Sequence, residues 1–266
     1  MESVRRSAVA GLFYPSSPRE LQSMVEEYLE KASGGGHTET GPKAVIVPHA
    51  GFVYSGPIAG SALSLLRRES DQIRRIVLLG PAHRVPVRGL ALPGVDGFET
   101  PLGVVPVDAE LVDQVVGLPQ VGISREAHAP EHCLEVELPF LQVLLGSFSV
   151  LPLLVGDATP GEVAAVLDCV WGGAETRIVI SSDLSHYLEY SQAQEVDART
   201  AEEVMALRSP ISVNQACGAG AINGLLVAAV EHGLKASLLD LRSSGDTAGD
   251  RSRVVGYGAF AFAEPH

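Results

Sequence analysis

The sequence predicts an α/β fold, a single three-layer α/β/α domain built around a mainly parallel or mixed sheet. Short runs of β-branched and aliphatic residues, bounded by glycine or proline, alternate with segments whose apolar residues recur at helical spacing. Strands that alternate with helices in this way favour parallel pairing, with helices on both faces of the sheet. The 266 residues suit one large domain, and no linker, repeat or low-complexity segment divides them. We therefore expect residues 1–266 to form one domain.

The first helix is expected to begin at Ser17, whose hydroxyl can cap it, and to end near Ala32. Gly34–Gly36 follow, and this Gly/His/Thr stretch is our candidate for a mobile loop. The predicted strands are Ala44–Val47, Arg75–Leu79, Gly89–Leu92, Val104–Val107, Val150–Val155, Arg177–Ile180, Ser237–Leu241 and Val254–Phe262. The later predicted helices are Ile58–Arg68, Ala109–Val116, Glu135–Leu145, Pro160–Val170, Gln192–Met205 and Ala219–Glu231.

The composition excludes several classes of protein. An apolar share of 46% and a charged share of 19% argue against a disordered chain or a coiled coil. The 19 basic and 32 acidic residues give a net charge of −13, which disfavours a nucleic-acid partner. No apolar run is long enough to cross a membrane, and the N-terminus lacks the apolar stretch of a signal peptide. Three widely separated cysteines argue against a disulfide scaffold, so we expect a cytoplasmic protein.

Histidines follow three of the predicted strands. His49, His83 and His186 each come shortly after a buried run, where the strand should end. In an open α/β sheet, ligands bind beyond the carboxyl ends of the strands, so these side chains are expected to face one rim. The alternative is that each histidine caps its strand or satisfies a buried polar group.

Asp183 precedes His186 by three positions, so one turn of helix would place both side chains on the same face. A carboxylate beside an imidazole can fix its tautomer and raise its basicity, as a general base or a metal ligand requires. The alternative is that Ser182 and Asp183 form the N-cap of a helix.

Cys217 stands just before the predicted helix Ala219–Glu231. The helix dipole is expected to stabilise its thiolate, which would favour nucleophilic attack or metal binding, although a buried packing role is the alternative. Cys133 and Cys169 are both interpreted as packing residues. His132 lies in a carboxylate-rich segment that could equally form a solvated helix start.

Four segments together carry a resemblance to a known family, in the same order and over nearly the whole chain. They are Val47-Pro48-His49-Ala50-Gly51-Phe52-Val53-Tyr54-Ser55-Gly56, Leu79-Gly80-Pro81-Ala82-His83, Glu131-His132 through Leu138-Pro139-Phe140, and Ser181-Ser182-Asp183-Leu184-Ser185-His186-Tyr187. The sequence resembles the Memo family, which includes protein B of the AmmeMemoRadiSam system. That resemblance implies a fold like that of the class III extradiol dioxygenases, which are non-haem iron enzymes.

The resemblance also implies the roles of particular residues. It makes His49, His83 and Cys217 the metal ligands, with Asp183 and His186 close by. Because an imidazole suits proton transfer near neutrality, we expect His186 and Asp183 to be the catalytic pair. The resemblance places a further group near the ligands or the substrate, namely His132, Glu137, Tyr54 and Ser182. The sequence departs from the family pattern at Glu137, where the family often has histidine, and at Ala221, where it often has proline.

Three functions remain open from the sequence. The first is a metal-dependent redox protein, a non-haem iron or copper enzyme linked to oxygen and acting on a small molecule or a modified peptide. Two imidazoles and a thiolate suit Fe(II), and also copper or zinc. The second is a metal-free adaptor that binds a peptide or an anion in the same pocket. The third is a cysteine hydrolase with Cys217, His186 and Asp183. Companion proteins of the AmmeMemoRadiSam system are expected partners.

Overall fold

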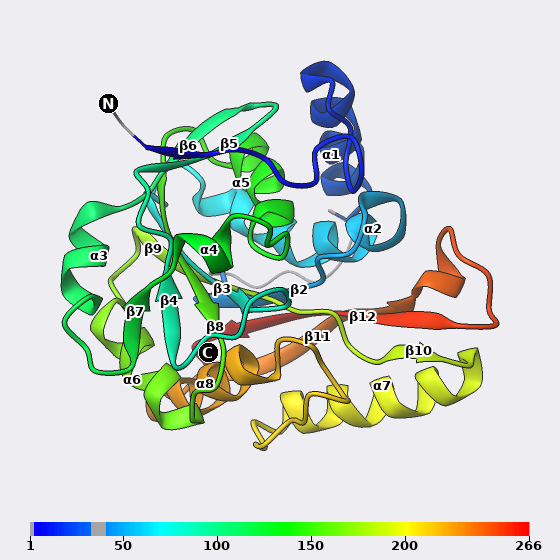
Figure 1. Ribbon diagram of the computed structural model, residues 1–266. Coiled ribbons are helices and arrows are strands. Elements are labelled where there is room, and N and C mark those ends of the chain that lie inside the picture. Colours follow the sequence, from blue (N-terminus) through cyan, green and yellow to red (C-terminus); the bar gives the residue numbers. More distant parts are fainter. Residues whose placement is uncertain (1–2, 33–40, 266) are drawn as a thin grey trace.

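The computed structural model describes residues 3–32 and 41–265. The expected mobile loop at Gly34–Gly36 lies outside these residues. Within them, nine strands form one mixed sheet in the order β10-β12-β2-β9-β3-β8-β4-β7, with β11 paired to β12 (Figure 1). These strands are β2 (Ala44–Val47), β3 (Arg75–Pro81), β4 (Leu90–Leu92), β7 (Val121–Ile123), β8 (Ser149–Val155), β9 (Thr176–Ser181), β10 (His186–Leu188), β11 (Lys235–Ser243) and β12 (Val254–Ala263).

The four central strands β2, β9, β3 and β8 pair in parallel, as the alternation of strands and helices predicted. Antiparallel pairing begins on either side, between β12 and β2 and between β4 and β8. The sheet is therefore mixed, with a parallel centre.

Helices cover both faces of the sheet, and this confirms the predicted three-layer α/β/α architecture (Figure 1). One face packs against α3 (Ala109–Val115), α6 (Pro160–Cys169), α7 (Tyr190–Met205) and α8 (Ala219–Glu231). The other face packs against α1 (Pro18–Ala32), α2 (Phe52–Leu63) and α5 (Leu138–Leu144).

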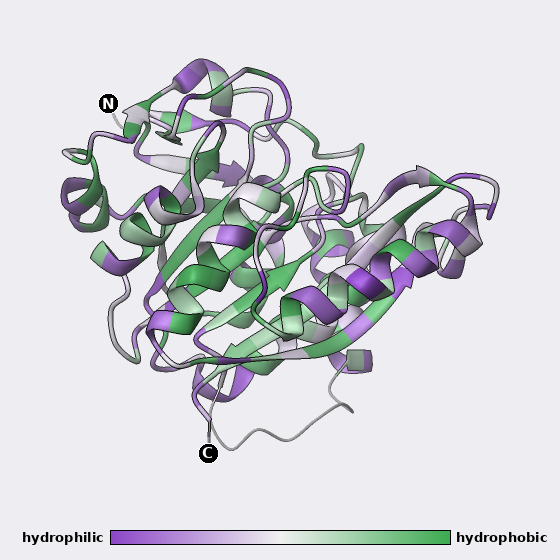
Figure 2. Ribbon diagram, turned by 90° about the horizontal axis from the view of Figure 1, so that it is seen from below, coloured by the Kyte–Doolittle hydropathy of each residue, from purple (hydrophilic) through white to green (hydrophobic). Residues whose placement is uncertain are grey.

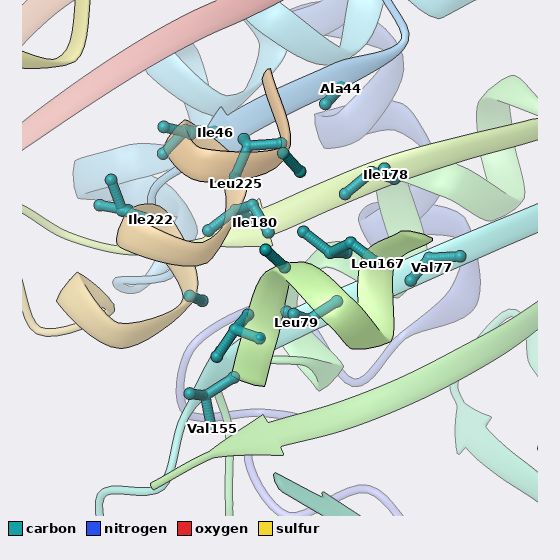
Figure 3. Packing of buried hydrophobic residues seen from close by; sticks show 14 of the residues in the cluster. Ala44, Ile46, Val77, Leu79, Val155, Leu167, Ile178, Ile180, Ile222 and Leu225 are labelled. Carbon is teal, nitrogen blue, oxygen red and sulfur yellow. The ribbon is translucent and has the colours of Figure 1, made fainter. Parts of the chain in front are cut away.

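Side chains alternate between these two faces along each central strand. Val77 and Leu79 of β3 lie in the core with α6 and α8, whereas Ile76 and Leu78 lie in the core with α1 and α2. Figure 3 shows Leu167, from α6, against the strands of the first core. Because both faces are covered, the strands read as continuous apolar runs, and Figure 2 shows them as mostly hydrophobic.

The differences from the predicted elements are local. The helix predicted at Ile58–Arg68 begins instead at Phe52, continues past Pro57 and turns into the 3-10 helix η1 (Ser64–Glu69). Proline is usually found in the first turn of a helix, so Pro57 led to a predicted helix start at Ile58 that is too late. The helix predicted at Glu135–Leu145 is a 3-10 turn, η2 (Glu135–Glu137), followed by α5.

Several short elements were not predicted because their pattern is too short to detect. A second sheet of three strands, within the same described ranges, consists of β1 (Val4–Arg5), β5 (Gly97–Thr100) and β6 (Gly103–Pro106). The strand predicted at Val104–Val107 belongs to this sheet. Strands β7 and β10, helix α4 (Arg125–His128) and the 3-10 helix η3 (Ser244–Asp246) were also missed. Among the described residues, no helix combines the length and apolar character needed to cross a bilayer.

Helices α6 and α8 pack closely because Gly224 has no side chain. A Cβ atom at Gly224 would lie 2.2 Å from Cγ1 of Val163. We expect Gly224→Ala to lower the free energy of unfolding by about 1–3 kcal/mol, the usual cost of overpacking. Gly161→Ala is the matched control, because no atom lies within 4 Å of a Cβ there. Urea unfolding measures both variants, and an unchanged midpoint for Gly224→Ala would contradict this packing.

Candidate metal centre

A cavity of about 690 Å³ opens where the parallel strands β2, β3 and β9 end. His49 follows β2, His83 follows β3, and Asp183 and His186 follow β9; all four side chains line the cavity. This shared edge is the one that the rule for open α/β sheets indicated. His132, which precedes η2, lines the same cavity.

Three imidazoles converge in this cavity. His49, His83 and His132 each offer a nitrogen, and these nitrogens lie within 4.8 Å of one another. The ring centroids are 5.2 Å apart for His49 and His83, 5.4 Å for His49 and His132, and 5.0 Å for His83 and His132. A second group in the described part of the chain shares one of these ligands and consists of His83, Glu131 and Cys133.

The buried carboxylate of Glu131 holds the imidazole of His83 and lies close to that of His132, whose Nδ1 forms no hydrogen bond within the described residues. Its Oε1 lies 2.9 Å from Nδ1 of His83 and 3.0 Å from Nδ1 of His132, and its Oε2 accepts the backbone N–H of His83 at 2.7 Å. Burial raises the pKa of Glu131, but contacts with His132 and His83 lower the pKa by more than burial raises it. The net shift is downward, so the carboxyl is ionised. A carboxylate can only accept, so Nδ1 of His83 carries the proton and its Nε2 is free to bind a metal.

A hydroxyl holds the third imidazole. Ser181 Oγ lies 2.7 Å from Nδ1 of His49 and also donates to the carbonyl oxygen of Cys133 at 2.7 Å. Because the hydroxyl has one proton, Nδ1 of His49 is the donor in their bond and Nε2 is unprotonated. Burial, together with His132 and His83, lowers the pKa of His49 well below its usual value, so the ring is neutral at neutral pH.

Cys217 lies beside His49 at the edge of the three imidazoles. Its Sγ is 3.4 Å from Nε2 of His49, 3.7 Å from the carbonyl oxygen of Asp183 and 3.9 Å from Oγ of Ser182. Burial and the nearby Asp183 raise the pKa of the Cys217 thiol to about 12. The expectation that the helix terminus would depress this pKa is therefore wrong for the metal-free chain, since burial outweighs the hydrogen bonds with Ser182 and the backbone of Gly218 that lower the pKa.

The expected helical turn at Asp183 and His186 is also wrong. The chain stays extended, because the N–H of Leu184 bonds to the carbonyl of Gly256 and His186 pairs with β12. Asp183 does not cap a helix; its Oδ1 accepts the backbone N–H of His49 at 2.8 Å. Ser182 contacts the start of a helix that lies far away in the sequence. Its Oγ accepts the N–H of Gly218, which directly precedes α8, at 2.9 Å.

The remaining predicted residues take varied positions. Tyr54 lines the cavity, while Glu137 is fully buried and its Oε1 lies 3.1 Å from Oγ of Ser181. Burial raises the pKa of Glu137 well above its usual value. Cys133 is buried, as predicted, but Cys169 is exposed at the end of α6, so its interpretation as a core residue is wrong.

Sequence reasoning did not identify Glu131 or Ser181 as site residues. Glu131 stands next to His132 in a segment with three carboxylates, and nothing in that pattern separates it from Glu135. Ser181 is the last residue of a buried strand. A polar residue at such a position indicates a hydrogen-bonded site, because a buried hydroxyl needs a partner.

The family model and the curated relatives that match this chain name the same family. The family described as "Memo-like protein" matches residues 5–261. A "MEMO1 family protein" of Nitrosopumilus maritimus is 34% identical over 97% of this chain and 99% of that protein, and one of Methanopyrus kandleri is 35% identical over 97% and 98%. A solved structure of an uncharacterized Escherichia coli K12 protein covers 80% of this chain and 98% of that chain, with a TM-score of 0.49 and 13% identity.

The contacts of Glu131 lead to a testable expectation. Glu131→Gln removes the charge that keeps Nδ1 of His83 protonated, so we expect a 10–100-fold loss of affinity for Zn(II) or Co(II). Glu126→Gln is the matched control, since Glu126 is exposed on α4 outside the cavity. Titration of the metal-free protein measures both variants, with circular dichroism to confirm folding. Equal affinities in a folded Glu131→Gln variant would contradict this role.

Proposed function

The chain belongs to the Memo family, and on this basis we propose that it binds a redox-active metal and performs oxygen-linked chemistry. Fe(II) is our first choice, with copper and zinc as the alternatives. The substrate is a small molecule or a modified peptide, and companion proteins of the AmmeMemoRadiSam system are proposed partners. The observation that carries this proposal is the convergence of three imidazoles on one cavity, with the thiol of Cys217 3.4 Å from Nε2 of His49.

The donor set fits a metal. Two of the three imidazoles have Nδ1 held by Ser181 or Glu131, which leaves Nε2 for the metal, and such outer partners are typical of metal-binding histidines. The separation of 3.4 Å between Sγ of Cys217 and Nε2 of His49 is close to the roughly 3.6 Å expected when both bind one ion tetrahedrally. We therefore propose His49, His83 and Cys217 as ligands, with His132 beside them.

A bound metal would supply a Lewis-acidic or redox-active centre and would favour the thiolate of Cys217. The chain's own residues would then transfer protons and position the ligands. His186 lines the cavity without belonging to the group of three imidazoles, so it is placed to accept a proton from a substrate hydroxyl. Asp183 positions His49 through its backbone N–H.

A cysteine hydrolase is the second candidate, because Cys217 and His49 form a close thiol–imidazole pair. The partner is His49 rather than His186, which differs from the triad that the sequence indicated. A hydrolase also requires a thiolate, and the thiol pKa of about 12 together with the lowered pKa of His49 favours the neutral pair. The metal-dependent function therefore fits the pair better.

The third ligand can be identified by spectroscopy. We expect Co(II)-loaded protein to show the near-ultraviolet absorption of a metal–thiolate bond, since Cys217 is a ligand. Cys217→Ser should lose this band, whereas His132→Ala and the exposed-thiol control Cys169→Ser should keep it. A band that survives in Cys217→Ser, or that is absent from the unmodified protein, would show that the thiol does not bind the metal.

The division between ligand and proton acceptor gives a further expectation. His49→Ala should lose the metal, whereas His186→Ala should keep it and lose about 10²–10⁴-fold in the rate of oxygen uptake, as for a general base. Metal analysis and an oxygen electrode, with catechols as the screening substrates, measure these effects. His232→Ala, which removes an imidazole outside the cavity, is the control. If His186→Ala is purified without metal, His186 is a ligand and its assigned role is wrong.

A further inference from the structure

Two arginines line the mouth of the metal cavity. Arg84 follows His83 at the end of β3, and Arg253 directly precedes β12, so they approach the cavity from different elements. Both are exposed. Seven other lysines and arginines pair with carboxylates in the described ranges, but neither Arg84 nor Arg253 forms an ion pair there.

Two acidic side chains, Asp183 and Asp250, also line this cavity, but neither forms an ion pair with Arg84 or Arg253; both accept backbone N–H groups instead. Oδ1 of Asp183 accepts the N–H of His49 at 2.8 Å, and Oδ1 of Asp250 accepts the N–H of Ser252 at 2.8 Å. The chain as a whole carries a net charge of −13. In a protein this acidic, two guanidinium groups that lack an ion-pair partner among the described residues can offer a local site for an anion at this cavity.

Aromatic side chains also line the cavity, and one of them lies beside Arg253. Tyr187 is 64% exposed, and its ring centroid lies 5.2 Å from Cζ of Arg253. Its backbone has a φ of 59°, a left-handed conformation that is uncommon for a bulky residue and concentrates at functional sites. Phe13 and Tyr54 also line the cavity. The volume of about 690 Å³ lies in the usual range for small-molecule sites and would admit a planar ring.

We propose that the cavity binds a small aromatic molecule bearing a carboxylate or phosphate group, which Arg84 and Arg253 hold at the mouth. The acid group then lies between the guanidinium groups, the ring lies against Tyr187, and the opposite end of the molecule points towards the histidines. This inference rests on the proposed function only in assigning that opposite end to the metal.

The test measures binding of three probes to the full-length chain by NMR titration, in metal-free and Zn(II)-loaded protein. The probes are 4-hydroxybenzoate, 4-hydroxyphenyl phosphate and the neutral 4-hydroxybenzyl alcohol. We expect at least one anion to bind more tightly than the neutral probe. Arg84→Gln and Arg253→Gln should each weaken that anion about tenfold and leave the neutral probe unchanged. Arg84→Lys and Arg253→Lys should restore part of the affinity, because they keep the charge.

Arg88→Gln is the matched control, since Arg88 is exposed near Arg84 in sequence but does not line the cavity. If 4-hydroxybenzoate binds more tightly than 4-hydroxyphenyl phosphate, the ligand's acid group is a carboxylate. If the phosphate binds more tightly, the ligand is a phosphate ester. Equal binding of the anions and the neutral probe, or an equal loss in Arg88→Gln, would overturn the proposal. Metal affinity is measured separately, so a chain that selects anions through these arginines but binds no metal would refute the proposed function alone.

Discussion

The candidate site depends on one buried carboxylate. Glu131 accepts the Nδ1–H and the backbone N–H of His83, and its Oε1 also accepts the backbone N–H groups of His132 and Cys133. Arg5 binds the carbonyl oxygen of Glu131 and pairs with the buried Glu135, so β1 anchors the segment that carries the carboxylate. Removing one partner from such a buried network leaves an unpaired charge, which is why the segment has little freedom to move.

The parallel centre of the sheet determines where this network meets the other proposed ligands. Strands β2, β3 and β9 run in the same direction, so His49, His83 and Asp183 emerge at one edge although they lie far apart in sequence. Ser181 then fixes the imidazole of His49, and Glu131 fixes that of His83. Hydrogen bonds between backbone and side chain, such as that from the N–H of His49 to Oδ1 of Asp183, join these loops to one another. The site is therefore a product of strand direction first and of side-chain bonding second.

This hierarchy explains how much the sequence could predict. Strand ends are visible in an apolar pattern, so the edge and the placement of His49, His83 and His186 on it followed from the sequence alone. The contacts of Glu131 span 48 residues, and no local pattern encodes them. The extended path after β9 was missed because pairing with β12 overrides the spacing of Asp183 and His186. The thiol pKa of Cys217 was misjudged because burial is a property of the folded chain.

The central claim is that this edge of the sheet holds a metal. The most direct measurement is the metal content of the protein after anaerobic purification without an affinity tag. The account predicts about one iron, or one copper or zinc, for each chain, released by a chelator and restored by adding the ion back. Protein that is folded, contains no stoichiometric metal and takes up none when iron, copper or zinc is added would contradict it.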